Sequence, residues 1–156
     1  MDCVVLLAIG DRLIEHDHVF TDPDELIRRL SHLDITPASL GESLEVLEGE
    51  QYIRGTHAIG RKFALIKLHH RGADVLMKTK FPNWQEIERK VATRIVNNPR
   101  VDNKSISERL SFPVAVIDHV LQGLAARHLV RLTGQSQGGL ICVIETSAQL
   151  RRSVTG

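Results

Sequence analysis

Apolar side chains recur at helical spacing along the first half of the chain. A stripe through residues 2–17 predicts one helix, and a shorter stripe after Pro23 predicts a second. From Thr36 onward, Leu40 and Leu44 continue the pattern, so we expect a third helix that stops near residue 49, where a glycine follows.

The pattern then changes to that of strands. Residues 52–54 and 63–68 are rich in apolar and β-forming side chains, and the segment Gly55 to Gly60 between them is typical of a turn. We therefore expect a hairpin, followed over residues 69–76 by one more helical turn.

The second half repeats this order. Helices are predicted over residues 84–97, after a cap at Asn103 or Ser105, and from Phe112 onward. Strands over residues 129–132 and 140–144 flank a glycine-rich loop at 134–139. The last ten residues either add a short basic helix or fray.

A direct repeat accompanies this order. The segment from Leu47 to Thr56 recurs as Leu124 to Thr133, and equivalent positions differ by 77 in residue number. That period is too long for a solenoid and suits two small modules in tandem. We predict an α+β, mainly α protein with one domain over residues 1–80 and a second over 81–156, the latter ending in a short tail.

Composition is that of a globular protein: 156 residues, 42% of them hydrophobic and 25% charged. The chain has no apolar run of membrane-spanning length and no secretory signal, so the expected location is the cytoplasm and no membrane partner is expected. The two cysteines, Cys3 and Cys142, stand in apolar surroundings and are interpreted as buried thiols.

Charge is distributed unevenly, although the formal net charge is only +1. Residues 1–50 hold three basic and twelve acidic side chains, residues 51–80 hold seven and one, and residues 81–156 hold ten and six. A polyanion would therefore be attracted to some surfaces and repelled by others.

Two copies of three helices followed by a hairpin resemble the winged helix-turn-helix family, in which the hairpin is called the wing. The resemblance covers nearly the whole chain. It is carried by apolar positions of both copies, namely Leu26, Leu30, Leu40, Leu44, Leu47, Tyr52 and Ile53, and Ile106, Leu110, Ile117, Leu121, Leu124, Leu129 and Val130.

The resemblance implies a transcription regulator that binds double-stranded DNA as a dimer, with each third helix in the major groove and each wing along the backbone or in the minor groove. The implied contacts are the first wing's Arg54, His57, Arg61, Lys62 and Lys67, and the second module's Gln122, Arg127 and Arg131.

The first candidate reading helix departs from this pattern, because Glu42, Glu45 and Glu48 face outward and would repel phosphates. On the second reading helix, Asp118 and His119 are expected to face outward beside the DNA-compatible residues. The wing and the second module are therefore expected to supply the attraction.

The sequence gives little support to an enzyme. No nucleophile has an evident base partner and no phosphate-binding loop is present, so an enzyme is not expected. No metal site and no cofactor is predicted. The alternative function is a protein-interaction adaptor, since the apolar first helix and the apolar strand at 140–144 suit an assembly role, either as a homodimer or with another protein.

Overall fold

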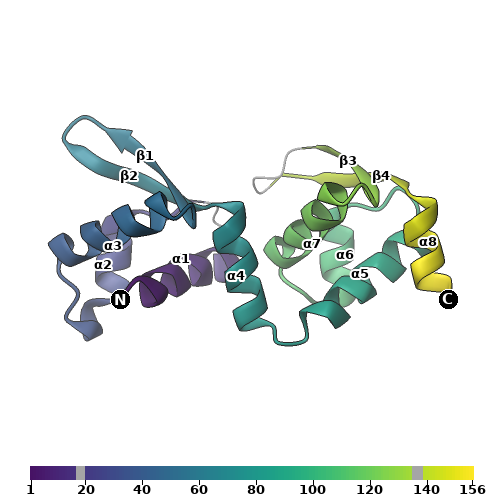
Figure 1. Ribbon diagram of the computed structural model, residues 1–156, viewed down its shortest axis with the longest axis horizontal. Coiled ribbons are helices and arrows are strands. Elements are labelled where there is room, and N and C mark those ends of the chain that lie inside the picture. Colours follow the sequence, from purple (N-terminus) through teal and green to yellow (C-terminus); the bar gives the residue numbers. More distant parts are fainter. Residues whose placement is uncertain (17–19, 135–138) are drawn as a thin grey trace. The chain divides into compact units, whose positions relative to one another are not determined.

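The chain forms two compact units, Met1–Lys80 (unit 1) and Phe81–Gly156 (unit 2). The computed structural model describes residues 1–16, 20–134 and 139–156. Each unit combines helices with one antiparallel two-stranded hairpin (Figure 1), which confirms the predicted α+β, mainly α class. None of the helices in the described ranges is long and apolar enough to cross a membrane.

Unit 1 starts with three helices, continues with the hairpin and ends in a fourth helix. Its elements are α1 (Asp2–His16), α2 (Pro23–Arg29), a 3-10 turn (Ser31–Leu33), α3 (Pro37–Gly49), β1 (Ile53–Ala58), β2 (Arg61–Leu68) and α4 (His70–Lys80).

Side-chain caps fix where α2 and α3 begin. Asp22 accepts a hydrogen bond from the backbone N–H of Asp24, and a proline follows at the first helical position. Thr36 and Ser39 form a reciprocal capping box at the start of α3. Both starts lie where the proline and the preceding polar residue predict them.

The core of unit 1 lies between its helices and the inner face of its hairpin. It is formed by apolar side chains with exposed fractions below one tenth: Val5, Leu6, Ala8, Ile9, Leu26, Leu30, Leu40, Leu44, Leu47, Ile53, Phe63 and Ile66.

Helix α4 packs tightly against the entry to the hairpin. A Cβ added at Gly72 would lie 2.0 Å from the backbone oxygen of Tyr52, which also accepts the N–H of His69. The Arg71 guanidinium covers the Tyr52 ring at 4.6 Å from its centroid. The expected single helical turn is therefore a helix of 11 residues that closes the unit.

Unit 2 repeats the order of helices and strands and ends in a short helix. Its elements are α5 (Trp84–Asn97), α6 (Asn103–Leu110), α7 (Val114–Ala126), β3 (Val130–Gly134), β4 (Ile141–Thr146) and α8 (Ala148–Thr155). Of the two outcomes foreseen for the tail, the helix is the one observed.

The cap of α6 differs from the prediction. Asp102, not Asn103 or Ser105, accepts the hydrogen bond, and its donor is the Ser105 N–H at 2.9 Å. Asn103 is fully buried and uses its amide elsewhere: it donates to Asp118 at 2.7 Å and accepts from the Ile141 N–H at 3.1 Å.

The sequence repeat is also a repeat of backbone hydrogen bonds. Tyr52 N–H donates to the Leu47 carbonyl at 2.8 Å, and Leu129 N–H donates to the Leu124 carbonyl at 2.9 Å. In each pair of equivalent residues the positions are 77 apart. The chain therefore leaves the third helix and enters the hairpin by the same route in both units.

Left-handed backbone repeats at the same interval. Gln51 and His128 have φ of 61° and 58°, and Asp34 and Ser111 have φ of 53° and 57°. None of the four is glycine, so the turns are imposed by the packing around them rather than by a permissive residue.

Two predictions need correction. β1 continues through Gly55 to Ala58, so the turn is shorter than expected, and Thr56 supports the longer pairing by accepting the Leu65 N–H. Cys3 is exposed on the outer side of α1 and Cys142 is half-buried, so neither is a fully buried thiol. Four residues of the 134–139 loop lie outside the described ranges.

Candidate nucleic-acid interface

The hairpin of unit 1 carries all five positions predicted as contacts of the first wing, four of them Lys or Arg and one the histidine His57. Arg54 and Lys67 are opposite each other in the register of β1 and β2. Arg54 is exposed, whereas Lys67 is half-buried with its ammonium 5.8 Å from the centroid of the Phe20 ring. Two like charges at one place on the hairpin favour a bound anion.

The other three positions contact acidic residues of the helices. Arg61 pairs with Asp24 of α2 at 3.0 Å, and Lys62 pairs with Glu45 of α3 at 2.5 Å. His57 lies 3.9 Å from Glu48 of the same helix. Acidic residues of α2 and α3 thus compensate Arg61 and Lys62 of the hairpin, although both cationic side chains stay more than half exposed.

Glu48 also has a structural task. Its carboxylate accepts the backbone N–H of Gly55 at 2.9 Å and so ties α3 to β1. A Cβ at Gly55 would lie 2.4 Å from the Phe63 ring, which explains why the strand has a glycine there. One of the three outward glutamates is therefore explained by folding alone.

In unit 2, the predicted arginines are paired as well. Arg127 contacts Glu88 of α5 at 2.6 Å, and Arg131 contacts Glu145, its cross-strand partner, at 3.1 Å. Gln122 is half-buried on α7. The predicted site residues of unit 2 thus offer little free hydrogen-bonding capacity for base edges.

The expected outward orientation of Asp118 and His119 is wrong. Both side chains are 8% exposed. Asp118 accepts the hydrogen bond of the Asn103 amide, and the His119 ring packs at 5.5 Å from that of Trp84 on α5. Helix α7 therefore uses these polar positions to hold unit 2 together.

Ion pairing differs between the two units. Seven of the ten Lys and Arg side chains in unit 1 lie within 4 Å of a carboxylate. In unit 2 only three of ten do so, counting carboxylates of the described residues. The seven others are Arg89, Arg94, Arg100, Lys104, Arg109, Arg151 and Arg152.

Three of these seven line one groove between α5 and α6, which we call the basic groove. It has a volume of about 370 Å³ and is lined by Arg89, Lys90, Thr93, Arg94, Asn97, Asn98, Arg109 and Leu110. The sequence did contain a signal for it, because five of these residues form the polar stripe of α5 opposite the buried Ile87, Val91 and Ile95.

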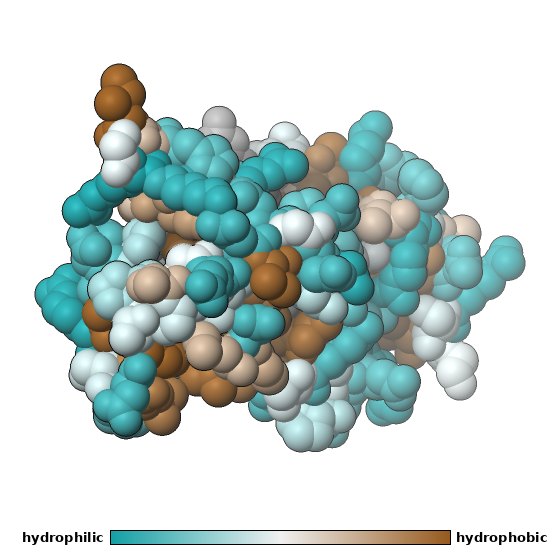
Figure 2. All heavy atoms as spheres, turned by 60° about the vertical axis from the view of Figure 1, so that its left-hand side comes forward, coloured by the Kyte–Doolittle hydropathy of each residue, from teal (hydrophilic) through white to brown (hydrophobic). Residues whose placement is uncertain are grey.

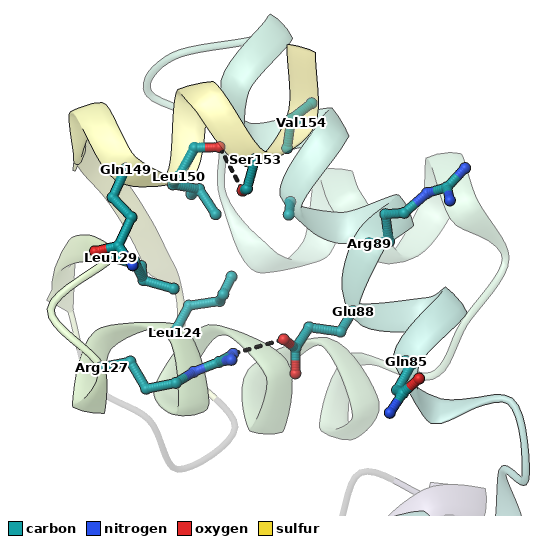
Figure 3. A pocket seen from close by; sticks show the side chains of 11 residues that line it. Gln85, Glu88, Arg89, Leu124, Arg127, Leu129, Gln149, Leu150, Ser153 and Val154 are labelled. Atoms are coloured by element: carbon teal, nitrogen blue, oxygen red, sulfur yellow. Dashed lines mark hydrogen bonds and ion pairs between the residues drawn. The ribbon is translucent and has the colours of Figure 1, made fainter. Parts of the chain in front are cut away.

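A second hollow in unit 2, of about 330 Å³, lies between α5, α7 and α8. Figure 3 shows Glu88 and Arg127 directed toward one another across it, and Ser153 bonded to the Leu150 carbonyl. Leu124 and Leu150 are almost wholly covered by their neighbours. Because Glu88 and Arg127 satisfy each other, these two charged groups offer a ligand little.

Apolar side chains are also exposed on both hairpins. Ile59, at the tip between β1 and β2, is fully exposed, and hydrophobic colour marks the projecting tip in Figure 2. Leu65 is exposed on the same hairpin, and Leu140 and Ile144 are exposed in unit 2. Exposed apolar residues at hairpin tips and faces are compatible with contacts to another macromolecule.

Two carboxyl groups have lowered pKa values. The hydrogen bond from the Lys90 ammonium is the main reason why the pKa of Glu86 lies below its ordinary value. The pKa of Asp102 is lowered chiefly by the backbone N–H of Ser105. Both carboxylates have structural partners, so neither resembles an acid or base poised for catalysis.

Comparison with known protein families, curated proteins and solved structures finds no match to this chain. Among the described residues, no group of three or more His, Cys, Asp or Glu side chains is arranged to hold a metal ion. A functional assignment therefore depends on the charges and geometry of the two units themselves.

Proposed function

We propose that this chain is a non-enzymatic DNA-binding protein with two winged helix-turn-helix modules, and that unit 2 supplies most of its attraction to duplex DNA. The observation that carries the proposal is the uneven ion pairing, which leaves seven cations of unit 2 without a carboxylate partner in the described ranges. Duplex DNA carries one negative charge per about 1.7 Å of its helix axis. It therefore attracts cations that no carboxylate neutralises more strongly than cations in ion pairs.

The hairpin of unit 1 contributes less in this proposal. Exposed ion pairs are worth at most about 1 kcal/mol each, so a phosphate can compete for Arg61 and Lys62. The carboxylates of Asp24 and Glu45 nevertheless stay beside the hairpin and repel the phosphate. Arg54 is the position of this hairpin best suited to a DNA contact.

Binding through cations alone carries little sequence information. The acidic α3 and the largely buried α7 supply few donors for base edges, with Gln122 as the main exception. We therefore expect a protein that holds the phosphate backbone and has a weak preference for sequence.

The test is a fluorescence-anisotropy titration of the full chain against a labelled duplex over a salt series. Affinity is expected to fall steeply between about 50 and 200 mM salt, with a slope of about −0.9 for each phosphate neutralised. Failure to bind duplex DNA at the lowest salt would end the proposal.

A charge-neutralising variant tests the role of the unit 1 hairpin. Asp24→Asn with Glu45→Gln removes the partners of Arg61 and Lys62 and is expected to raise DNA affinity several-fold at low salt. The matched control removes two carboxylates that form no ion pair in the described ranges, Asp2→Asn with Asp34→Asn. An equal gain in DNA affinity in the control would show that the change in net charge is the cause, and not the release of Arg61 and Lys62.

A protein-interaction adaptor is the second candidate. It is favoured by exposed apolar side chains that DNA binding does not require, namely Val46, Ile59, Leu65, Leu140 and Ile144. Light scattering after size exclusion, in the absence of DNA, is the measurement. Dimers that dissociate when Leu140→Ser and Ile144→Ser are introduced would support self-association through unit 2, whereas a monomer at all concentrations would exclude a homodimer.

A further inference from the structure

We infer that the basic groove between α5 and α6 is a seat for the phosphate backbone of DNA. The inference rests on the proposed function. It concerns a surface other than the third helix and the hairpin, which are the elements that the family resemblance implies as DNA contacts. The groove is contained within unit 2, since its lining comes from α5, α6 and the residue after α5.

The lining is cationic and lacks acidic residues. Arg89, Lys90, Arg94 and Arg109 contribute four positive charges, and no Asp or Glu of the described residues lines the groove. Among the ion pairs of the described residues, one involves this set, that of Lys90 with Glu86 at 2.9 Å. Four like charges around one hollow of about 370 Å³ repel each other, and a bound anion relieves that repulsion.

Arg94 is the least satisfied of the four. Its side chain is half-buried and lines the groove, and its Nε is buried without a hydrogen-bond partner among the described residues. A buried N–H without an acceptor is unfavourable, so this guanidinium has unused hydrogen-bonding capacity beside the groove. This observation is independent of the charge count.

The chemistry of the lining favours phosphate over an acidic peptide. Guanidinium groups bind phosphate oxygens in pairs, and the amides of Asn97 and Asn98 and the hydroxyl of Thr93 are further polar groups of the lining. Leu110 is the one aliphatic residue of the lining, so a peptide would find no pocket for an apolar anchor. Repeated phosphates need no such anchor.

The spacing along α5 suits an extended backbone rather than a single ion. Arg89, Thr93 and Asn97 recur at i, i+4 and i+8, and such positions lie on one face of a helix. With a rise of about 1.5 Å per residue, this stripe is about 12 Å long, comparable with three to four phosphate steps of one strand at about 3.4 Å each along the duplex axis.

The experiment compares two double variants of the full chain with equal loss of charge. Arg89→Gln with Arg109→Gln changes two exposed residues of the groove, and Arg151→Gln with Arg152→Gln changes two exposed residues of α8 outside it. Affinity for a labelled duplex is measured over a salt series, and far-UV circular dichroism checks that both variants fold.

The groove variant is expected to bind about tenfold more weakly at about 100 mM salt, with its salt slope reduced by one to two phosphate contacts. The α8 control is expected to bind more weakly than the unsubstituted chain by less than about threefold. Equal losses in the two variants would overturn the groove assignment and leave the DNA-binding function standing.

Two further outcomes separate the remaining alternatives. If the unsubstituted chain does not bind duplex DNA, the proposed function fails, and the assignment of the groove to DNA fails with it. If the groove variant keeps its DNA affinity but loses binding to a labelled polyglutamate peptide that the unsubstituted chain binds, the groove is a site for acidic protein segments and the phosphate assignment is wrong.

Discussion

Replacing Asn103 by alanine is expected to destabilise unit 2 more than any other polar substitution discussed for it. The side chain is fully buried and its amide makes four hydrogen bonds. It donates to Asp118 and to the Gly139 carbonyl, and accepts the N–H groups of Lys104 and Ile141. One side chain thereby joins α6, α7 and the start of β4.

The loss in the free energy of unfolding depends on which hydrogen-bond partners of Asn103 water can reach after the substitution. The Lys104 N–H is at the exposed first turn of α6 and can be hydrated. The Ile141 N–H is buried and loses its acceptor, and the Asp118 carboxylate, only 8% exposed, loses the hydrogen bond from Asn103. With about 1–3 kcal/mol for the buried N–H left unsatisfied and about 1 kcal/mol for the lost bond to Asp118, the free energy of unfolding falls by about 2–4 kcal/mol.

The assay is urea unfolding followed by tryptophan fluorescence. Trp84 is the only tryptophan of the chain and packs against His119 in unit 2, so its signal reports this unit. The control is Asn97→Ala at an exposed position of α5, expected to change stability by less than about 0.5 kcal/mol. A loss of less than about 1 kcal/mol for Asn103→Ala would refute the reasoning, because the buried amide would then be dispensable.

Two further predictions concern backbone packing and pH. Gly72→Ala is expected to destabilise unit 1 by several kcal/mol, because its Cβ would lie 2.0 Å from the Tyr52 backbone oxygen, whereas Gly41→Ala has open space and should stabilise α3 by up to about 1 kcal/mol; thermal unfolding by circular dichroism distinguishes them. The lowered pKa of Asp102 means that its cap stabilises unit 2 above the unfolded-state pKa of about 4 and that this contribution is lost as the pH falls through the lower folded value. Asp102→Asn keeps a capping side chain without the titration, so its urea midpoint, read from Trp84, should fall less in acid than that of the unsubstituted chain; parallel acid profiles would contradict this.

Local patterns in the sequence were sufficient to predict most of the helices and both hairpins. Proline after a polar cap marks the starts of α2 and α3, and the apolar stripe through Leu40 and Leu44 gives the buried face of α3. These signals depend on residues within a few positions of each other. They can therefore be recognised without knowledge of tertiary contacts.

Partners distant in the sequence were beyond such patterns. A count of charges marks Arg61 and Lys62 as a basic tip, but it does not reveal that Asp24 and Glu45 meet them. Periodicity likewise assigned Asp118 to the outer face of α7, because a polar residue is assumed to face water. Its actual partner, Asn103, lies on another helix.

The basic groove was missed for a different reason. Its residues belong to the polar stripe of an ordinary amphipathic helix, and such a stripe is usually just a solvated surface. It becomes a candidate site only when Arg109 of α6 is brought beside Arg89 and Arg94 of α5 and no carboxylate joins them in the lining. The lack of a carboxylate beside these arginines is a property of the fold and not of local composition.

The two units share a backbone design but differ in how they treat charge. The hydrogen bond that leads from the third helix into the hairpin repeats between Leu47 and Tyr52 and between Leu124 and Leu129. The ion pairs do not repeat: the unit 1 hairpin is compensated by α2 and α3, whereas Arg131 of unit 2 is compensated only across its own hairpin. Since backbone bonds set the fold and surface charges set the attraction to polyanions, a repeated scaffold can keep one structure while its two copies differ in how many of their cations are neutralised by carboxylates.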